Sequence, residues 1–458
     1  MAHKIPNFIN VRDYQKDAIS SWYNNNGKGL LEMATGTGKT ITALSLSANL
    51  TKTVGKLAII VVTPFTQLSL QWVEECRNFN LLPIKAFENK NKWSPKMEQY
   101  IDAYNENLLE NICIVTTNAT FSQKTFQSLL ANLKNPALLI IDEAHYFGAK
   151  NLSKSLPEHI NFRLALTATP ERWMDEEGSE RLLNYFGNKV VYKFGLDQAI
   201  KEGFLTRYYY YPHLVELTPD EAESYVELTL KIRKLSHQAK VDKEKKEIMN
   251  RLAIKRARII YSAHNKMNVL RGIIEKNINI KKSLFYCGDG KVQSDVNIEV
   301  RQLDGVMSLL RNEFNIEAKR FTSSEPNKTR SKILTDFEKG EIDALVAIKC
   351  LDEGIDVPST QTAYLISSTS NPKEFIQRRG RVLRKHKDKH HAIIHDFIVL
   401  PPNPYDFYEK EDEMFNIERA QLGKELQRFA EFSNLAINGP EADNVIWKVK
   451  QKYNLLDM

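Results

Sequence analysis

The stretch LEMATGTGKT, from Leu31 to Thr40, contains closely spaced candidate ligand-binding residues. Its end, Gly38-Lys39-Thr40, matches the end of the phosphate-binding pattern G-x-x-x-x-G-K-[ST], but Met33 stands where that pattern has its first glycine. In such a loop Lys39 supplies positive charge to the β- and γ-phosphates of a nucleotide, and Thr40 supplies a hydroxyl to Mg²⁺. The stretch therefore predicts a nucleotide-phosphate site with one substitution.

The sequence on either side of this loop supplies the context that phosphate binding needs. GLLEM before the loop is typical of a short buried strand, and TITALSLSANL after it is typical of a helix. The amides and the dipole at a helix N-terminus then face the phosphates, and Gly36 and Gly38 allow the backbone turns that point N–H groups inward. The residues expected to bind the nucleotide here are Thr35, Gly36, Thr37, Gly38, Lys39 and Thr40.

A second set of candidate catalytic residues follows a buried strand, in ALLIIDEAH at 137–145. Asp142 is expected to hold Mg²⁺ through water, together with the hydroxyl of Thr40. Glu143, one residue further on, is expected to take a proton from the attacking water. Two adjacent carboxylates at the carboxyl end of a strand suit hydrolysis, because one remains on the metal while the other polarises water.

Short apolar runs rich in β-branched residues are the elements that must position these side chains. They recur with enough residues between them for a crossover helix, which is the pattern of a parallel sheet covered on both faces. Two separate series of such runs predict an α/β fold class with two parallel-sheet domains in tandem. The predicted strands lie at 57–63, 112–117, 137–142, 163–169, 283–288, 318–323, 343–348, 362–367 and 391–397.

The segment between the two series has a different composition. From Arg207 to Arg258 there is almost no strand signal and there are many Lys, Arg and Glu residues, with Thr218 and Glu221 placed as a helix capping box around Pro219. The chain after the second series also has helical spacing. The predicted organisation is a first domain at 1–206, a basic helical connector at 207–258, a second domain at 259–404 and a helical tail at 405–458.

Bulk composition narrows the class of protein. Of 458 residues 42% are hydrophobic and 26% charged, which suits an ordinary folded protein, and the net charge of +7 is compatible with a polyanionic partner. The four cysteines have no C-x-x-C spacing and most sit in apolar runs, which favours buried thiols in a reducing compartment. Without a leader-like start or a membrane-length apolar run, the expectation is a soluble, cytoplasmic protein.

These motifs together resemble those of superfamily 2 helicases and translocases of the DEAD/DEAH-box kind, whose loops often lack the first glycine that Met33 replaces here. The family implies two RecA-like domains that use ATP and Mg²⁺. Segments such as CLDEGIDVPS are similar in sequence to the branch that contains excision-repair translocases and restriction-enzyme motor subunits. The motifs that carry the resemblance are VRDYQKDAI at 11–19, ATGTGKT at 34–40, VVTPFTQLSLQW at 61–72, IVTTNATF at 114–121, DEAH at 142–145, LTATPER at 166–172, SLFYCG at 283–288, ALVAIKCLDEGIDVPS at 344–359 and QRRGRVLRK at 377–385.

The resemblance assigns roles to residues outside the phosphate loop of the first domain. Gln15 of the Q motif is expected to read the adenine edge. Thr167 and Thr169 of motif III, with His145 of the DEAH box, are expected to link the state of the nucleotide to the nucleic acid. In motif V, Gly354 and Asp356 are expected near the ribose and the domain interface.

Motif VI is expected to complete the site from the second domain. Arg381 and Arg384 are three residues apart, so they share one face of a short helix and can meet the γ-phosphate as arginine fingers, a role worth ~10³–10⁵ in rate. By resemblance, Gln377 bridges the two domains near His145. The alternative for an arginine run is a solvated face, which is retained for Arg378 or Arg379.

Contacts to nucleic acid are expected to go to phosphates, with little reading of bases. The candidate contact residues are Thr66, Thr117 and Thr322, each at or near the end of a predicted strand. The connector from Lys231 to Arg258 is strongly basic and is expected either to lie over the strand or to form a solvated helix face; the sequence leaves both open.

The leading functional prediction is an ATP-dependent helicase or translocase that acts on DNA. An RNA helicase is the alternative within the same chemistry, and an ATP-gated nucleic-acid clamp or scaffold is the alternative of another class. No nuclease or sequence-reading module is recognised in the sequence, which favours a motor that works for protein partners in restriction, antiviral defence or repair. No membrane partner is expected.

Overall fold

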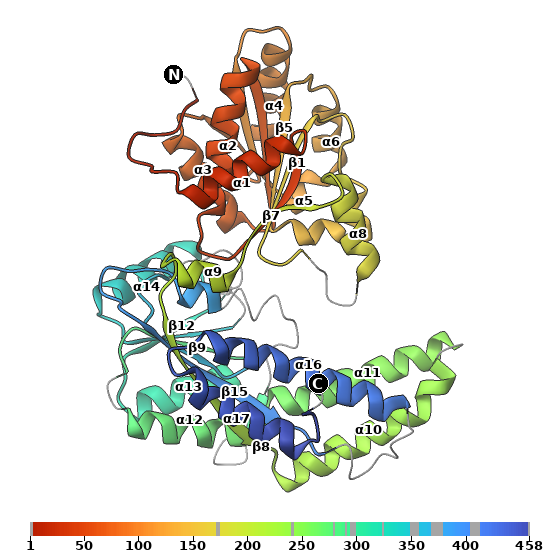
Figure 1. The fold of residues 1–458 in the computed structure, drawn as a ribbon, viewed down its shortest axis with the longest axis vertical. Coiled ribbons are helices and arrows are strands. Elements are labelled where there is room, and N and C mark those ends of the chain that lie inside the picture. The colour runs from red at the N-terminus through yellow and green to blue at the C-terminus, as the bar shows by residue number, and fades with distance from the viewer. Residues whose placement is uncertain are drawn as a thin grey trace. The chain divides into compact units, whose positions relative to one another are not determined.

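The computed structural model describes residues 3–170, 175–239, 242–277, 280–288, 291–293, 299–322, 325–348, 357–367, 379–403 and 413–456. The chain divides into two compact units, one built mainly from residues up to Leu205 and the other mainly from Thr206 onward, and each is described by itself (Figure 1). Across the described residues, a helix with the length and apolar content of a membrane span is not found.

The first unit is built on a seven-stranded sheet in which every strand pair is parallel, in the order β3-β4-β2-β5-β6-β1-β7. The parallel sheet predicted from the apolar runs is confirmed. The predicted strands do not include β3 and β7, which are short, partly buried strands at the two edges of the sheet. The strands are β1 (Lys28–Met33), β2 (Leu57–Thr63), β3 (Pro83–Ala86), β4 (Asn111–Thr117), β5 (Ala137–Asp142), β6 (Phe162–Thr167) and β7 (Val190–Phe194).

Helices cover both faces of this sheet. Trp93, Met97, Phe126 and Leu182, from α4, α6 and α8, join one apolar cluster with the central strands, and Figure 1 shows α2 and α3 on the opposite side of the sheet from α6 and α8. The central strands can therefore be apolar on both faces. The helices are α1 (Asp13–Asn24), α2 (Lys39–Val54), α3 (Thr66–Asn78), α4 (Lys90–Asn105), α5 (Asn118–Phe121), α6 (Lys124–Ala131), η1 (Ala144–Gly148), α7 (Lys150–Ser153), α8 (Glu176–Tyr185) and α9 (Leu196–Lys201).

The second unit is built on a six-stranded sheet, again with parallel pairs throughout, in the order β12-β13-β9-β14-β15-β8. Its strands are β8 (Tyr208–Glu216), β9 (Ser283–Tyr286), β12 (Ala318–Phe321), β13 (Ala344–Ala347), β14 (Thr362–Leu365) and β15 (Ala392–Leu400), and an antiparallel pair is formed by β10 (Lys291–Gln293) and β11 (Glu299–Arg301). Its helices are α10 (Pro219–Ala239), α11 (Lys243–Tyr261), α12 (Asn265–Lys276), α13 (Gln302–Ser308), η2 (Leu309–Glu313), α14 (Asn327–Lys339), α16 (Glu413–Leu435) and α17 (Gly439–Lys452).

The expectation that a helical connector begins at residue 207 is wrong for its first part. Residues 208–216 form β8, which pairs with β15 along its whole length. A run of four tyrosines followed by Leu214 and Val215 favours a strand. Pro212 within that run argues against a central strand, but β8 lies at the edge of the sheet, where proline is tolerated.

The helical parts of the connector and of the tail are present. Thr218 and Glu221 form the predicted capping box, with the Thr218 amide donating to Glu221 Oε2 (2.9 Å) and the Glu221 amide donating to Thr218 Oγ1 (3.3 Å). The turn between α16 and α17 covers the outer edge of β8, because the side-chain amide of Asn438 accepts from the Tyr210 amide (2.8 Å) and donates to its carbonyl (3.0 Å). The tail thus protects an edge strand that would otherwise be open to pairing.

Three of the four cysteines lie within the described residues, and all three are buried with free thiols, as the apolar runs predict. Cys76 and Cys113 approach each other, with 3.8 Å between their sulfur atoms. Burial raises the pKa of the Cys287 thiol, so this cysteine stays protonated as a small apolar group. Cys350 lies outside the described residues.

Candidate nucleotide-hydrolysis site

The predicted phosphate loop joins the end of β1 to the start of α2. Gly36 and Gly38 have φ angles of 88° and 80°, a region that residues with a side chain rarely adopt, so glycine is required at both positions. Gly38 is the N-cap of α2, which points the first amides of the helix toward the loop. The loop therefore has the backbone turns and the helix N-terminus that phosphate binding needs.

Helix α1 holds this loop from the side. The Tyr14 hydroxyl donates to the Thr37 carbonyl (2.5 Å), and the Gln15 side-chain amide donates to the Gly38 carbonyl (3.3 Å). Gln15 Oε1 also accepts the Arg12 amide (3.0 Å), and Gln15 is buried. The structure thus gives Gln15 a role in holding the loop, while its expected contact with adenine stays a prediction.

The ammonium group of Lys39 is buried in the loop without a hydrogen bond to any described residue. The Glu143 carboxylate is 3.7 Å away. A buried ammonium without hydrogen bonds is costly unless an anion supplies them. This buried ammonium at a helix N-terminus, which has an ion pair with Glu143 but no hydrogen bond to a described residue, fits the phosphates of a nucleotide.

The two adjacent carboxylates leave β5 in different environments. Asp142 is 4% exposed, with Oδ2 accepting the indole N–H of Trp72 (2.8 Å) and Oδ1 accepting the Glu143 amide (2.9 Å). Burial raises the pKa of Asp142 and the charge of Glu143 raises it further, whereas Lys39, the Trp72 indole and the Glu143 amide lower it. The carboxylate of Asp142 and the hydroxyl of Thr40 are the hard oxygen ligands that suit Mg²⁺.

Glu143 has the left-handed backbone, with φ 49° and ψ 47°, that only a few non-glycine residues adopt. Such a conformation costs about 1–3 kcal/mol and is common at functional sites. It turns the chain directly after β5, and Glu143 Oε2 lies 3.5 Å from His145 Nδ1. The strained turn brings the proposed base beside both Lys39 and His145.

A line of contacts continues from this base to the end of β6. His145 Nδ1 is 3.3 Å from Thr167 Oγ1, and Thr167 Oγ1 in turn donates to the Thr169 carbonyl (3.0 Å) and accepts the Thr169 amide (3.2 Å). The structure therefore brings together all three residues that the resemblance assigned to coupling. Together with Lys39 and Glu143, these residues form a continuous path of contacts that ends in the segment after β6.

The three threonines predicted to contact nucleic acid all lie at or just beyond the carboxyl ends of parallel strands, but only Thr66 is exposed. Thr66 is exposed at the first position of α3. Thr117 caps α5 by accepting the Thr120 amide (3.3 Å), and Thr322 donates to Glu325 Oε2 (2.7 Å). The hydroxyls of Thr117 and Thr322 thus already have local partners, and their contact with nucleic acid stays a prediction.

Four of the residues predicted from motifs V and VI lie outside the described residues, namely Gly354, Asp356, Gln377 and Arg378. Arg381 is 9% exposed and Arg384 is partly buried. Arg379 has no exposed surface, so the alternative of a solvated face is wrong for that arginine. The arginine-finger role stays a prediction.

Trp72 and Tyr14 are residues of this site that sequence reasoning missed, and Trp72 contacts a proposed metal ligand. Trp72 lies on α3 within the quoted motif VVTPFTQLSLQW, has no exposed surface, and donates to the carboxylate of Asp142. The helical spacing marks it only as an apolar core residue, because nothing in the spacing says that the indole N–H meets a carboxylate from another element.

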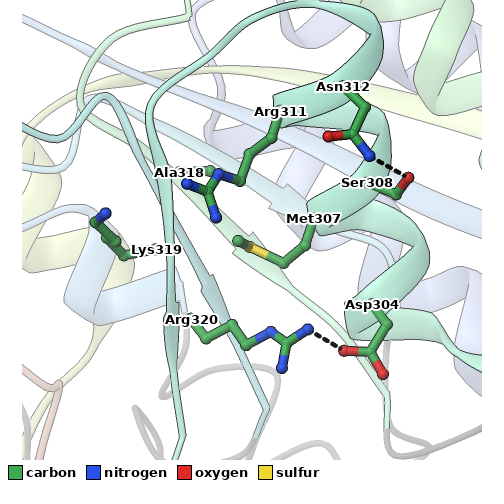
Figure 2. A pocket seen from close by; sticks show the side chains of 8 residues that line it. All are labelled: Asp304, Met307, Ser308, Arg311, Asn312, Ala318, Lys319 and Arg320. Atoms are coloured by element: carbon green, nitrogen blue, oxygen red, sulfur yellow. Dashed lines mark hydrogen bonds and ion pairs between the residues drawn. The ribbon is translucent and has the colours of Figure 1, made fainter.

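A cavity of about 450 Å³ lies elsewhere, on the second unit between β12 and the segment α13–η2 (Figure 2). Several of its polar side chains pair with each other or with neighbours: Arg320 contacts Asp304 (2.8 Å), and Lys319 contacts Glu317 (2.7 Å). None of the residues predicted for nucleotide binding lines it. The lining residues are Asp304, Met307, Ser308, Arg311, Asn312, Ala318, Lys319 and Arg320.

Two parallel α/β units, with a phosphate loop and a strand-end carboxylate pair in the first, define the class of nucleotide-driven motors with RecA-like domains. Comparison with known families makes this specific. Residues 8–172 match the family of the type III restriction enzyme res subunit, and residues 265–386 match the helicase conserved C-terminal domain. The chain therefore carries domains similar to a restriction-enzyme motor domain and to a helicase C-terminal domain, and it resembles superfamily 2 helicases and translocases.

Curated relatives cover most of the chain at low identity. The chain is 27% identical over 405 residues to the DNA 3′-5′ translocase XPB2 of Sulfurisphaera tokodaii, across 84% of this chain and 81% of the relative. It is 24% identical over 400 residues to a putative helicase of a Sulfolobus islandicus filamentous virus, of which the match spans 64%. A type I restriction enzyme EcoAI endonuclease subunit of Escherichia coli is 26% identical across 45% of this chain and 24% of its own length.

Solved structures support the fold. The type ISP restriction-modification enzyme LlaBIII bound to DNA aligns with a TM-score of 0.61 at 18% identity, across 94% of this chain and 31% of that enzyme. The Hef helicase domain of Pyrococcus furiosus aligns with a TM-score of 0.50 at 18% identity, across 85% of this chain and 95% of that domain. At these identities the likeness concerns the fold of the α/β domains alone.

Proposed function

We propose that this chain is an ATP-dependent motor directed to DNA, which couples ATP hydrolysis to movement along DNA or to separation of its strands. The observation that carries the proposal is the path of contacts Lys39–Glu143–His145–Thr167. This path joins the group that binds phosphate and the group that activates water to the segment after β6. It gives hydrolysis a physical route to the rest of the domain.

Each residue on the path has a task that its surroundings suit. The Lys39 ammonium binds the β- and γ-phosphates because it has no hydrogen-bond partner among the described side chains. Glu143 accepts the proton of the attacking water, and its left-handed turn holds the carboxylate beside Lys39. Bound Mg²⁺ supplies a Lewis acid that polarises a phosphoryl oxygen, and Thr40 and Asp142 are the residues proposed to hold it.

The remaining motif residues complete this proposal from the resemblance. Arg381 and Arg384 stabilise charge on the transferred phosphoryl group, with a contribution of ~10³–10⁵ in rate. Gln377 links this arginine segment to His145, and Gly354 and Asp356 contact the ribose side of the nucleotide. ATP then favours the arrangement in which all of these groups bind at once, and hydrolysis releases it.

The names of the relatives support DNA over RNA as the track. One relative is named a DNA 3′-5′ translocase, and the restriction-modification enzyme LlaBIII is described as bound to DNA. The exposed position of Thr66 at the carboxyl edge of the first sheet suits a contact to the phosphate backbone, which carries no sequence information. The basic connector from Lys231 to Arg258 is a second candidate for such contacts.

A panel of ATPase measurements tests the substrate. Single-stranded DNA, duplex DNA and RNA of equal length are compared at one ionic strength, because phosphate contacts make affinity salt-dependent. DNA is expected to raise turnover by ~5–150-fold, the usual range of coupling between two sites. Stronger stimulation by RNA would establish the RNA-helicase alternative, and turnover that no nucleic acid changes would favour the clamp or scaffold.

In the cell, the proposed role of this motor is that of a subunit that works for protein partners in restriction, antiviral defence or repair. Restriction subunits among the relatives support this idea. Affinity purification of the full chain from its native cells, with identification of co-purified proteins, tests it. Co-purification of a nuclease or a DNA-recognition subunit is expected, and full unwinding by the chain alone with no stable partner would contradict it.

A further inference from the structure

Helix α3 connects the exposed edge of the first sheet with the interior of the hydrolysis site. Thr66, its first residue, lies three residues beyond the end of β2 and is exposed, and Trp72, six residues further along, has no exposed surface. Six residues of α-helix span about 9 Å. One rigid element therefore links a surface position at the carboxyl edge of the sheet to the carboxylate of Asp142.

The N-terminal turn of α3 is fixed to the strand that precedes it. Thr63 Oγ1, at the end of β2, lies 2.7 Å from Ser69 Oγ, and Ser69 Oγ donates to the Phe65 carbonyl (3.3 Å). Both hydroxyls are fully buried. The helix therefore responds as one body to a force at Thr66, because its first turn cannot fray independently.

Among the described residues, two hydrogen-bond donors orient the Asp142 carboxylate. Oδ1 accepts the amide of Glu143, which belongs to the same strand end, and Oδ2 accepts the indole N–H of Trp72 from α3. A hydrogen bond from a buried donor to a carboxylate is a strong one, and groups that orient a metal-binding carboxylate affect metal affinity. Trp72 is thus the donor through which another element reaches Asp142.

We propose that Trp72 is a positioning residue, which holds the Asp142 carboxylate in the orientation that binds the Mg²⁺–nucleotide. When nucleic acid binds at Thr66 and displaces α3, Trp72 transmits that displacement to Asp142. This inference rests on the proposed function, since it assigns to one indole the regulation of the same site. It goes beyond the coupling path through His145 and Thr167, because it runs through a different element and ends on the metal-binding carboxylate.

Trp72→Phe tests this inference because it retains a six-membered aromatic ring and removes the five-membered ring of the indole with its N–H donor. Trp22→Phe is the matched control: Trp22 also has no exposed surface, and its indole N–H donates to a backbone carbonyl, that of Arg163 (2.9 Å). The measurement is the affinity for ADP by calorimetry, with Mg²⁺ and with EDTA, followed by the stimulation of ATPase activity by DNA.

Mg²⁺ should raise the ADP affinity of Trp72→Phe by ~10–100-fold less than it raises that of the wild type. The ADP affinity in EDTA should be the same in both proteins. Stimulation by DNA should fall in the same variant, and Trp22→Phe should match the wild type in both. An undiminished Mg²⁺-dependent gain in Trp72→Phe, or an equal loss in Trp22→Phe, would overturn the inference. If the proposed function itself fails, the wild type will show no Mg²⁺-dependent ADP binding.

A second measurement keeps the inference testable if Trp72→Phe does not fold. The chain has five tryptophans, so wild-type protein labelled with 5-fluorotryptophan gives few ¹⁹F resonances, and that of Trp72 is assigned by substituting the others singly. It should shift when Mg²⁺ and ADP are added together and shift again with DNA. A Trp72 resonance that neither addition moves would overturn the proposal.

Discussion

The carboxyl edges of the two parallel sheets both carry buried polar clusters, but the clusters differ in how far their hydrogen bonds are satisfied. In the second unit Gln302 Oε1 accepts from the Gly288 amide (2.6 Å) and from Ser367 Oγ (2.7 Å), and the buried Lys266 donates to the Tyr261 carbonyl (2.8 Å). In the first unit the Lys39 ammonium has no acceptor among the described residues.

This difference separates a structural cluster from a binding site within one type of fold. The Tyr261 carbonyl ends α11 and accepts from Lys266 and from the Gln302 side-chain amide, and Ser367 Oγ lies 3.3 Å from it, so these contacts tie the helical segment to the sheet. Such a network is complete without a ligand. The cluster around Lys39 is incomplete, and an anion supplies what it lacks.

The largest expected difference between the two clusters comes from substituting Lys39 and Lys266 in the same way. Lys39→Met should lower ATP turnover by at least ~10²–10³-fold, the usual loss for one preorganised donor at a reacting charge. Lys266→Met should leave nucleotide affinity and turnover close to wild type, because Lys266 serves only the second cluster. Steady-state kinetics on both variants decide the point, and equal losses would remove the distinction between the clusters.

Disrupting the second cluster should lower the free energy of unfolding and leave ATP turnover unchanged. Gln302→Ala leaves the Gly288 amide without its acceptor and removes a donor from the Tyr261 carbonyl, at a cost of ~2–3 kcal/mol in the free energy of unfolding. Urea unfolding measures this cost. Gln361→Ala is the control, since its exposed amide donates only to the Asp388 carbonyl, and a cost as large in that variant would show that the cluster has no special role.

The pH dependence of stability should report on Lys266. Burial lowers the pKa of Lys266 to about 7, so between pH 7 and the ordinary lysine value the unfolded chain binds a proton that the folded chain does not. The free energy of unfolding therefore rises with pH in that window, by up to ~1.4 kcal/mol per pH unit. The measurement is the difference between wild type and Lys266→Met in urea midpoints at pH 7 and pH 9, and parallel pH profiles would contradict the assignment.

The smallest expected effect concerns the path from the base to the end of β6. His145→Ala removes the contacts to Glu143 and Thr167, so basal turnover should persist while stimulation by DNA falls by ~5-fold or more. ATPase assays with and without duplex DNA measure the ratio. Full stimulation in this variant would place the coupling elsewhere, and α3 with Trp72 would then be the remaining candidate.

Much of the fold and the first half of the site follows from the sequence because both rest on local patterns. The β-branched runs that become β2, β4 and β5 are long and apolar, and the loop at Lys39 needs only its own glycines and the helix that follows. Asp142 and Glu143 were predictable for the same reason, since a strand end places them at the edge of the sheet that carries the loop.

The rest depends on contacts between elements, which periodicity does not encode. Nothing local says that the indole of Trp72 meets Asp142, or that Gln15 holds the Gly38 carbonyl. The strand β8 is missed because its proline is acceptable only at a sheet edge, and a position at the edge is a property of the whole sheet.

The most direct test of the central claim, that Glu143 activates water beside Lys39, is the turnover of Glu143→Gln. Removal of a general base should lower turnover by ~10²–10⁴-fold while ATP binding is retained, so the variant accumulates with ATP bound. The control is Glu177→Gln, whose side chain in the same unit is 89% exposed. ATP hydrolysis that survives in Glu143→Gln at the wild-type rate would contradict the account.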